Sequence, residues 1–127
     1  MPFVRITLAK GRSATFKQQI SHAVHQALIE AFGIPEDDRF QVIEELEPEN
    51  MVFPPRYMGI PHSERMIYIQ ITAKEGRSAE RKQALYRTLA ALIAQQGDQS
   101  SDDLVITLVE NDAANWSFGR GEAQLLQ

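Results

Sequence analysis

The chain of 127 residues contains no cysteine, which excludes disulfide bonds, thiolate catalysis and cysteine-ligated metal sites. It also has no excess of basic residues. Thirteen Lys and Arg stand against seventeen Asp and Glu, a net charge of −4 that disfavours nucleic-acid binding. The longest apolar run, Leu89–Ala94, has six residues, too few to span a membrane, and the first residues show no signal-peptide pattern. We therefore expect a cytoplasmic protein with neither a nucleic-acid nor a membrane partner.

An internal repeat is the most informative feature that is present. The segment Lys10–Ala14 is echoed by Glu75–Ala79, 65 residues later, and the same offset places the pair Asp37-Asp38 on Asp102-Asp103. A repeat of this length is usually one supersecondary unit whose apolar face a neighbouring unit must cover. The sequence therefore predicts two similar units in one chain.

Each copy shows a strand pattern at its start and at its end. Apolar residues alternate over 3–8 and again over 66–71, the period of a strand with one buried face. Second strands are predicted at Phe40–Leu46 and Leu104–Val109, and a short strand is expected over 51–53. A strand-helix-strand crossover makes its two strands parallel. We expect an α+β fold in which two fused β-α-β units form a four-stranded sheet with both helices on one face.

A helix is predicted between the strands of each copy. Ser13 and Ser78 follow a glycine turn and are candidate N-caps. Apolar side chains then recur at helical spacing, to a stop at Gly33 in the first copy and over 79–96 with a stop at Gly97 in the second. The two helices should cover one face of the sheet.

The opposite face of the sheet is expected to be apolar as well. It carries Phe3, Tyr68, Val105 and Val109, which suggests packing against other copies of the chain.

The length predicts a single domain over 1–127. Within it, the repeats cover 2–47 and 65–110, joined by a connector over 48–64 and followed by a tail over 111–127. The connector holds four of the six prolines, which is typical of a loop.

Pro2 is a candidate catalytic group. Removal of Met1 would leave Pro2 as the N-terminal residue with a secondary amine. An α-amino group titrates near roughly 7.7–8.0, and burial or a nearby carboxylate can adjust it for acid–base work. The alternative is that Pro2 merely starts an edge strand where no N–H is needed.

Several motifs together resemble the tautomerase superfamily, in particular its malonate semialdehyde decarboxylase members. They are Pro2 at the start of the first strand, the repeat, and the segments Phe32–Gln41, Leu108–Asn111 and Trp116–Gly121. The resemblance implies a homotrimer with one cofactor-free site per chain, centred on Pro2. The position equivalent to Pro2 in the second copy is Ile67, which has no free amine.

The resemblance also implies roles for individual residues. Asp38 matches the family's catalytic aspartate, and Arg77 matches one of two arginines that hold the substrate carboxylate. Lys74 lies nearest the second arginine and supplies charge without the guanidinium fork. Otherwise, Asp38 would be a solvated turn residue and Arg77 a helix-start residue, as Arg12 is in the first copy.

Aromatic residues of the tail complete the predicted site. Trp116 and Phe118 match the family's hydrophobic wall, although two tail aromatics could simply dock the tail. His22 and His25 lie at i, i+3 on one helix with no further ligand at metal spacing, so we predict a polar helix face and no metal.

Three functions follow from these observations. The first is a malonate semialdehyde decarboxylase-like enzyme with tautomerase and hydratase side activities, acting on a small oxo acid. The second is a keto-enol tautomerase of a 2-oxo acid such as phenylpyruvate. The third, of another class, is a non-catalytic trimer, cytokine-like or regulatory, for which Pro2 would be dispensable.

Overall fold

A four-stranded sheet forms the centre of the molecule. The computed structural model describes residues 1–95 and 98–127. The strands are β1 (Phe3–Ala9), β2 (Phe40–Leu46), β5 (Ile67–Lys74) and β6 (Leu104–Asn111), in the spatial order β2-β1-β5-β6. Strands β1 and β5 follow the alternation of apolar residues seen in the sequence. Strand β6 runs two residues further than predicted because its pairing with β5 continues to Asn111.

Strands β1 and β5, which run antiparallel, join the two repeats at the middle of the sheet. Strand β1 pairs with β2 in parallel, and β5 pairs with β6 in parallel, as expected for two β-α-β units. Between the units β1 and β5 run antiparallel, with Phe3 opposite Thr72. The start of β1 therefore lies beside the end of β5, and the end of β1 beside the start of β5.

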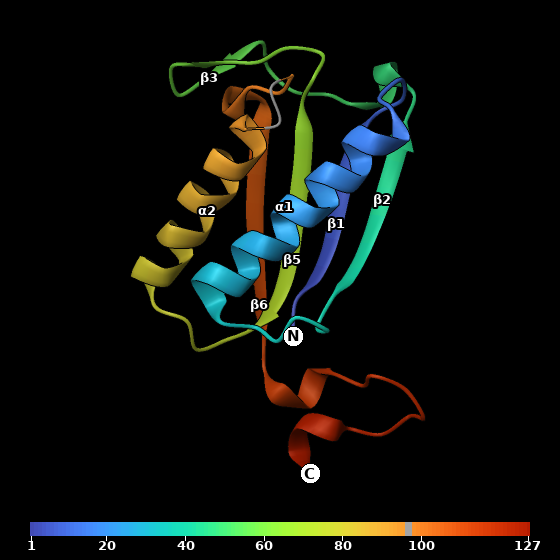
Figure 1. Cartoon of the computed structure of the whole chain (residues 1–127), viewed down its shortest axis with the longest axis vertical. Coiled ribbons are helices and arrows are strands. Elements are labelled where there is room, and N and C mark those ends of the chain that lie inside the picture. Colours follow the sequence, from blue (N-terminus) through green and yellow to red (C-terminus); the bar gives the residue numbers. More distant parts are fainter. Residues whose placement is uncertain (96–97) are drawn as a thin grey trace.

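Both helices cover the same face of this sheet (Figure 1). They are α1 (Ala14–Phe32) and α2 (Ala79–Ala94). Their apolar side chains and those of the inward strand positions form one buried core that includes Ile20, Leu28, Ile69, Leu85 and Leu89. The predicted fold class is confirmed. Strand alternation and helical spacing already separated the core positions from the exposed ones.

Equivalent turns of the two repeats have nearly the same backbone. Gly11 and Gly76 lie at φ 116° and 120°, values that favour glycine. Ser13 and Ser78 are the N-caps of α1 and α2, and each hydroxyl accepts a backbone N–H three residues ahead. The residues repeated in the two copies therefore form the same turn and the same helix cap.

Helix α2 ends at Ala94, and its predicted continuation to Gln96 with a stop at Gly97 lies outside the described residues. Four short 3-10 turns complete the secondary structure: Pro48–Asn50, Ser101–Asp103, Ala113–Asn115 and Gln124–Leu126. Within the described residues, no helix is both long and apolar enough to cross a membrane.

The strand expected over 51–53 is wrong. The connector instead forms a hairpin of β3 (Arg56–Tyr57) and β4 (Ile60–Pro61). Its two turn residues, Met58 and Gly59, have φ 50° and 81°, the positive values that a two-residue hairpin turn requires. Phe53 instead meets the ring of Tyr68 edge-on at 6.5 Å between centroids, and the backbone carbonyl of Val52 accepts from the Tyr68 hydroxyl at 2.9 Å.

The face of the sheet opposite the helices is only partly covered. Phe3, Val105 and Val109 are 37%, 43% and 43% exposed. Phe3 lies on β1 and the two valines on β6, with Tyr68 of β5 between these strands.

Candidate active site

The candidate site surrounds the N-terminus of the chain. The terminal ammonium of Met1 forms an ion pair with the carboxylate of Asp38. An open pocket of about 280 Å³ lies here, lined by Met1, Pro35, Asp37, Asp38, Phe40 and Phe118. Pro2 itself is buried at the start of β1. Of the predicted set, Asp38 and Phe118 line this pocket, Pro2 adjoins it through Met1, and Lys74, Arg77 and Trp116 are not among its lining residues.

The loop between α1 and β2 positions Asp38. Gly33 ends α1 in the left-handed region, at φ 67°, which turns the chain back toward the sheet. The backbone N–H of Asp38 donates to the carbonyl of Pro35 at 3.1 Å. Its side chain is only 13% exposed, so Asp38 does not lie in a solvated turn, whereas its neighbour Asp37 is exposed.

His25 fastens this loop to helix α1. Its ring Nε2 lies 2.7 Å from the carbonyl of Glu36, two residues before Asp38. His25 is buried, so the prediction that both histidines lie on a polar helix face is wrong for it, although His22 is exposed. The helical pattern alone did not reveal that the loop folds back over this turn of α1.

Replacing His25 tests this fastening. We expect His25→Leu to lower the free energy of unfolding by about 1 kcal/mol, because the carbonyl of Glu36 loses its partner. The amide of His25→Gln can still donate to that carbonyl and should keep most of the stability. Urea unfolding at one protein concentration measures both, and equal midpoints for the two variants would contradict a role for the hydrogen bond.

Arg77 and Lys74 lie at the end of β5, beside the start of β1. Arg77 donates from Nη1 to the backbone carbonyl of Lys74 at 2.9 Å, and its guanidinium stacks 4.7 Å from the centroid of the Phe32 ring. Extending the antiparallel register beyond Phe3 and Thr72 places Lys74 opposite Met1. The two cationic side chains therefore stand on elements adjacent to the chain terminus.

The electrostatic surroundings of Arg77 prepare it for an anion. Burial, and to a lesser extent the like charge of Arg81, lower the pKa of Arg77 from its ordinary value. The negative charges of Asp38 and Glu110 raise the pKa of Arg77, but by less. An arginine remains protonated after such a shift, but a half-buried guanidinium without full charge compensation attracts a carboxylate.

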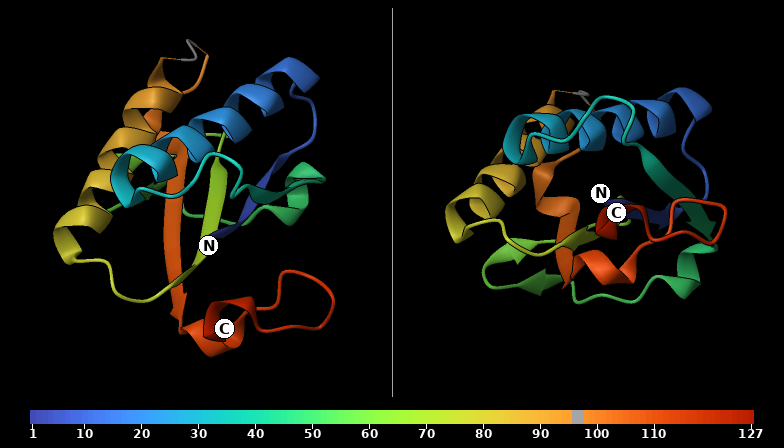
Figure 2. Two further views of the ribbon diagram at one scale, coloured as in Figure 1. Left: turned by 60° about the horizontal axis from the view of Figure 1, so that its bottom comes forward. Right: turned by 90° about the horizontal axis from the view of Figure 1, so that it is seen from below.

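The tail supplies an aromatic wall beside the terminus. Trp116 and Phe118 stack with centroids 5.5 Å apart and planes 13° from parallel, and Phe118 meets Phe40 at 5.7 Å. The tail folds beneath the end of the sheet from which the N-terminus emerges (Figure 1, Figure 2). The wall thus continues from the tail to Phe40 at the start of β2.

Two polar side chains hold this wall in place. Trp116 Nε1 donates to Asn111 Oδ1 at 2.7 Å, and Asn111 is the register partner of Lys74. Gln124 accepts from the N–H of Phe118 and donates to the carbonyl of Gly119, both at 2.9 Å. The sequence reasoning missed Gln124 and the lining residue Phe40 as members of the site, since neither shows a local pattern that marks it.

The two repeats differ in what their equivalent aspartate binds. Asp103, equivalent to Asp38, is buried and accepts from the backbone N–H and the hydroxyl of Ser63, at 2.7 and 2.6 Å. In both repeats the aspartate binds the segment that leads into the first strand. Only in the first repeat does that segment end in a free ammonium.

The part of the chain that the structure describes contains no set of ligands for a metal ion. No group of three or more His, Asp or Glu side chains gathers there in an arrangement that could hold an ion. The chemistry available at the site is that of an amine, a carboxylate, two cations and an apolar wall.

Comparison with known families gives concordant matches over the whole chain. Two family models, each described as tautomerase enzyme, match residues 2–59 and 38–119. The "Probable tautomerase YusQ" of Bacillus subtilis is 40% identical over 127 residues, which is the full length of both proteins.

Solved structures with the same fold include a decarboxylase. Malonate semialdehyde decarboxylase, described with decarboxylase and hydratase activities, superposes with a TM-score of 0.92 at 32% identity. The match covers 98% of this chain and 95% of that one. A fused 4-OT described as a symmetric trimer matches at a TM-score of 0.79 and 16% identity, over 98% of each chain, which shows a common fold.

Proposed function

The chain belongs to the tautomerase family, and we propose that it is a cofactor-independent enzyme acting on a small oxo acid through the amine of Pro2. The observation that carries this proposal is the pairing of the chain's terminal ammonium with Asp38 in a pocket bounded by Phe40 and Phe118. Removal of Met1 moves the ammonium by one residue, about 3.8 Å, to the start of β1. The secondary amine of Pro2 then takes its place in the site.

Asp38 has the role of setting the charge and position of the Pro2 amine. A carboxylate nearby favours the protonated amine, whereas burial of Pro2 favours the neutral one. The same carboxylate can orient a water molecule beside the proline. Asp38 is suited to this because its loop is fastened by His25 and its side chain is largely withdrawn from solvent.

Arg77 and Lys74 have the role of binding the substrate carboxylate. A guanidinium donates two parallel hydrogen bonds to a carboxylate, and an ammonium adds charge without that fixed geometry. Trp116 and Phe118 exclude water on the other side. An apolar wall beside a carboxylate disfavours its localised charge more than the dispersed charge that develops as CO₂ leaves.

In the decarboxylase reaction, protonated Pro2 donates a hydrogen bond to the carbonyl oxygen of a 3-oxo acid. The bond between C2 and the carboxylate carbon breaks, CO₂ leaves, and the electron pair moves toward the carbonyl, which takes the proton to give an enol. Return of a proton to carbon yields the aldehyde. The sum is one 3-oxopropanoate and one proton giving acetaldehyde and CO₂, with hydration and tautomerisation as accompanying activities.

A tautomerase reaction is the second candidate. Here neutral Pro2 takes a proton from the enol oxygen or the carbon of a 2-oxo acid such as phenylpyruvate and returns it to the other atom. Two observations favour it: Lys74 lacks the guanidinium fork, and the full-length relative from Bacillus subtilis is named a probable tautomerase.

The pH dependence of kcat/KM separates the two reactions. Decarboxylation of 3-oxopropanoate needs protonated Pro2, so kcat/KM should fall as the pH rises through the pKa of the proline amine. Ketonisation of phenylenolpyruvate needs neutral Pro2, so kcat/KM should fall as the pH drops below that pKa. The substrate with the larger kcat/KM at neutral pH, with the matching sign of its profile, identifies the main activity. Activity on neither substrate would contradict the proposed substrate class.

We also propose that the protein works as a homotrimer. The apolar face formed by Phe3, Val105 and Val109 would be covered in such an assembly. The fold shared with a fused 4-OT described as a trimer supports this proposal.

A further inference from the structure

The duplication creates a second pocket at the opposite end of the two central strands. Because β1 and β5 are antiparallel, the end of β1 lies beside the start of β5. Residues 8–12 and 64–66 line a cavity of about 180 Å³ there. By the 65-residue offset, Arg12 occupies the place of Arg77, and Met66 occupies the place of Met1. The cavity is therefore the counterpart of the cationic side of the candidate active site.

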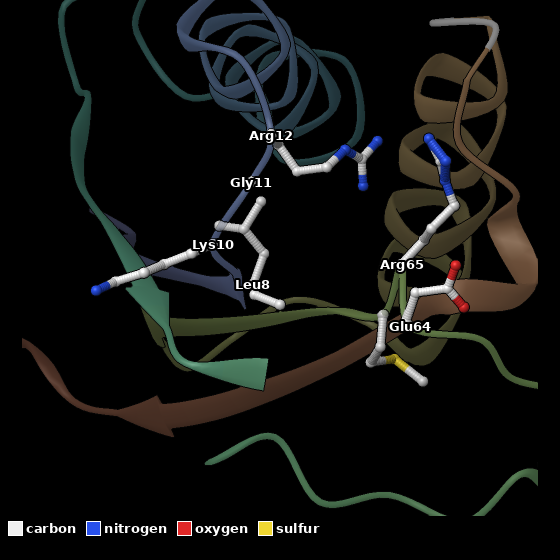
Figure 3. A pocket seen from close by; sticks show the side chains of 8 residues that line it. Leu8, Lys10, Gly11, Arg12, Glu64 and Arg65 are labelled. Carbon is white, nitrogen blue, oxygen red and sulfur yellow. The ribbon is translucent and has the colours of Figure 1, made fainter. Parts of the chain in front are cut away.

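Two arginines approach each other at this cavity (Figure 3). Arg12 lies 3.5 Å from the centroid of the Phe16 ring and donates from Nη1 to Gln99 Oε1 at 3.0 Å, as Arg77 stacks on Phe32 in the other site. Within residues 1–95 and 98–127, no carboxylate lies at ion-pair distance from Arg12. Its other contacts are a neutral amide, an aromatic ring and the backbone carbonyl of Asp98 at 3.5 Å, and the carboxylate of Asp98 compensates its charge only in part.

Arg65 is also incompletely satisfied. Its Nη2 forms an ion pair with Asp98 at 2.7 Å, but the side chain of Asp98 is 73% exposed. Its Nε is buried and has no hydrogen-bond partner in the described part of the chain. A buried donor without a partner is costly, and an added acceptor would satisfy it.

The charges around the cavity favour an anion. Burial, followed by the like charge of Arg65, lowers the pKa of Arg12, and Asp98 opposes this shift. Lys10 points away from the arginines and pairs with Glu47 at 2.7 Å (Figure 3). Glu64 stands exposed at the rim, where water and salt screen its charge. The two guanidinium groups therefore dominate the cavity.

We propose that this cavity is a second binding site, which takes a small carboxylate between Arg12 and Arg65. It differs from the first site in one respect that decides its chemistry. At the position of Pro2 it has Ile67, whose nitrogen is a peptide amide inside β5. The site can bind a carboxylate but has no amine for acid–base chemistry, so its ligand is held and not converted.

Calorimetric titration of the full-length protein with malonate, at low ionic strength, tests this site without measuring activity. The variant Arg77→Ala, which removes the guanidinium of the first site and leaves only Lys74 there, should still bind one malonate per chain at the second site. Adding Arg12→Ala or Arg65→Ala should raise the Kd for malonate by roughly 10- to 100-fold, because each removes a hydrogen bond to a charged group. Absence of binding in Arg77→Ala, or equal binding in the double variants, would overturn the proposal. Binding of inorganic phosphate but not of malonate would overturn the assignment to carboxylates.

A second measurement needs no substitution. Phenylglyoxal modifies accessible arginines, and mass spectrometry of the unsubstituted protein reports each one separately. Malonate should slow the modification of Arg12 and Arg65 several-fold but leave that of the exposed Arg87 unchanged. Equal rates with and without malonate would contradict the site even if a double variant failed to fold.

Discussion

Protein that keeps Met1 is expected to have a kcat/KM at least about 100-fold below that of the same chain with Pro2 at its terminus, the lower range of general acid–base catalysis. The retained residue blocks the pocket and leaves Pro2 as a tertiary amide that can neither donate nor accept a proton. Inhibiting methionine removal during expression yields the blocked form, and aminopeptidase treatment converts it. Intact mass and kcat/KM, measured on the same sample before and after treatment, give the result.

Pro2→Ala is the matched variant for this experiment. Alanine also permits methionine removal and leaves a primary amine of similar basicity in a more flexible backbone. We expect a loss of kcat/KM of the same order, with unchanged secondary structure. Full activity in Pro2→Ala, or in protein that retains Met1, would disprove proline catalysis and would favour the non-catalytic trimer.

Arg77→Ala is expected to lower kcat/KM about 100-fold, chiefly through a higher KM, because the substrate carboxylate loses a paired, charge-assisted contact. Arg77→Lys should recover part of this loss by charge alone, since an ammonium lacks the fork. Steady-state kinetics on the substrate identified by the pH profile measures both. A fall in kcat with unchanged KM would indicate that Arg77 acts in the chemical step and not in binding.

Two controls separate binding from folding. Arg77 also donates to the carbonyl of Lys74 and packs on Phe32, so its removal should cost some stability. Thermal unfolding of each variant measures that part. Arg87 is an exposed arginine of α2, the helix that follows Arg77, and Arg87→Ala should leave kcat/KM unchanged. An equal loss in Arg87→Ala would mean that only the net charge matters.

Whether the sequence predicts a feature depends on how far apart along the chain its interacting residues lie. The caps Ser13 and Ser78 and the turns at Gly11 and Gly76 depend on neighbouring residues, so their sequence pattern sufficed. The hairpin in the connector was missed because positive φ at Met58 is not a preference of methionine. His25 was misjudged because its partner, Glu36, belongs to a loop that folds back over the helix.

The candidate site also combines features that the sequence predicts with contacts between distant residues. A terminal proline, an aspartate before a strand and an arginine at a helix start are visible in the letters. The terminus meets Asp38 because β1 pairs with β2 in parallel, and the antiparallel pairing of β1 with β5, which no local pattern specifies, brings the Arg77 turn to the same end of the sheet. Likewise, the stack of Trp116 on Phe118 is held by hydrogen bonds that these two residues donate to Asn111 and Gln124.

The sequence by itself determined the two β-α-β units, their buried faces and the absence of thiol chemistry, because periodicity, capping and composition are local properties. Only the tertiary structure decided that the terminal ammonium meets Asp38, whereas the equivalent Asp103 binds Ser63. The reason is physical. The two units share their strands, turns and helix caps, but they differ in what precedes them, a free chain end in one case and a connector in the other. That difference places the free ammonium at one end of the sheet and a second pocket, which has no amine, at the other.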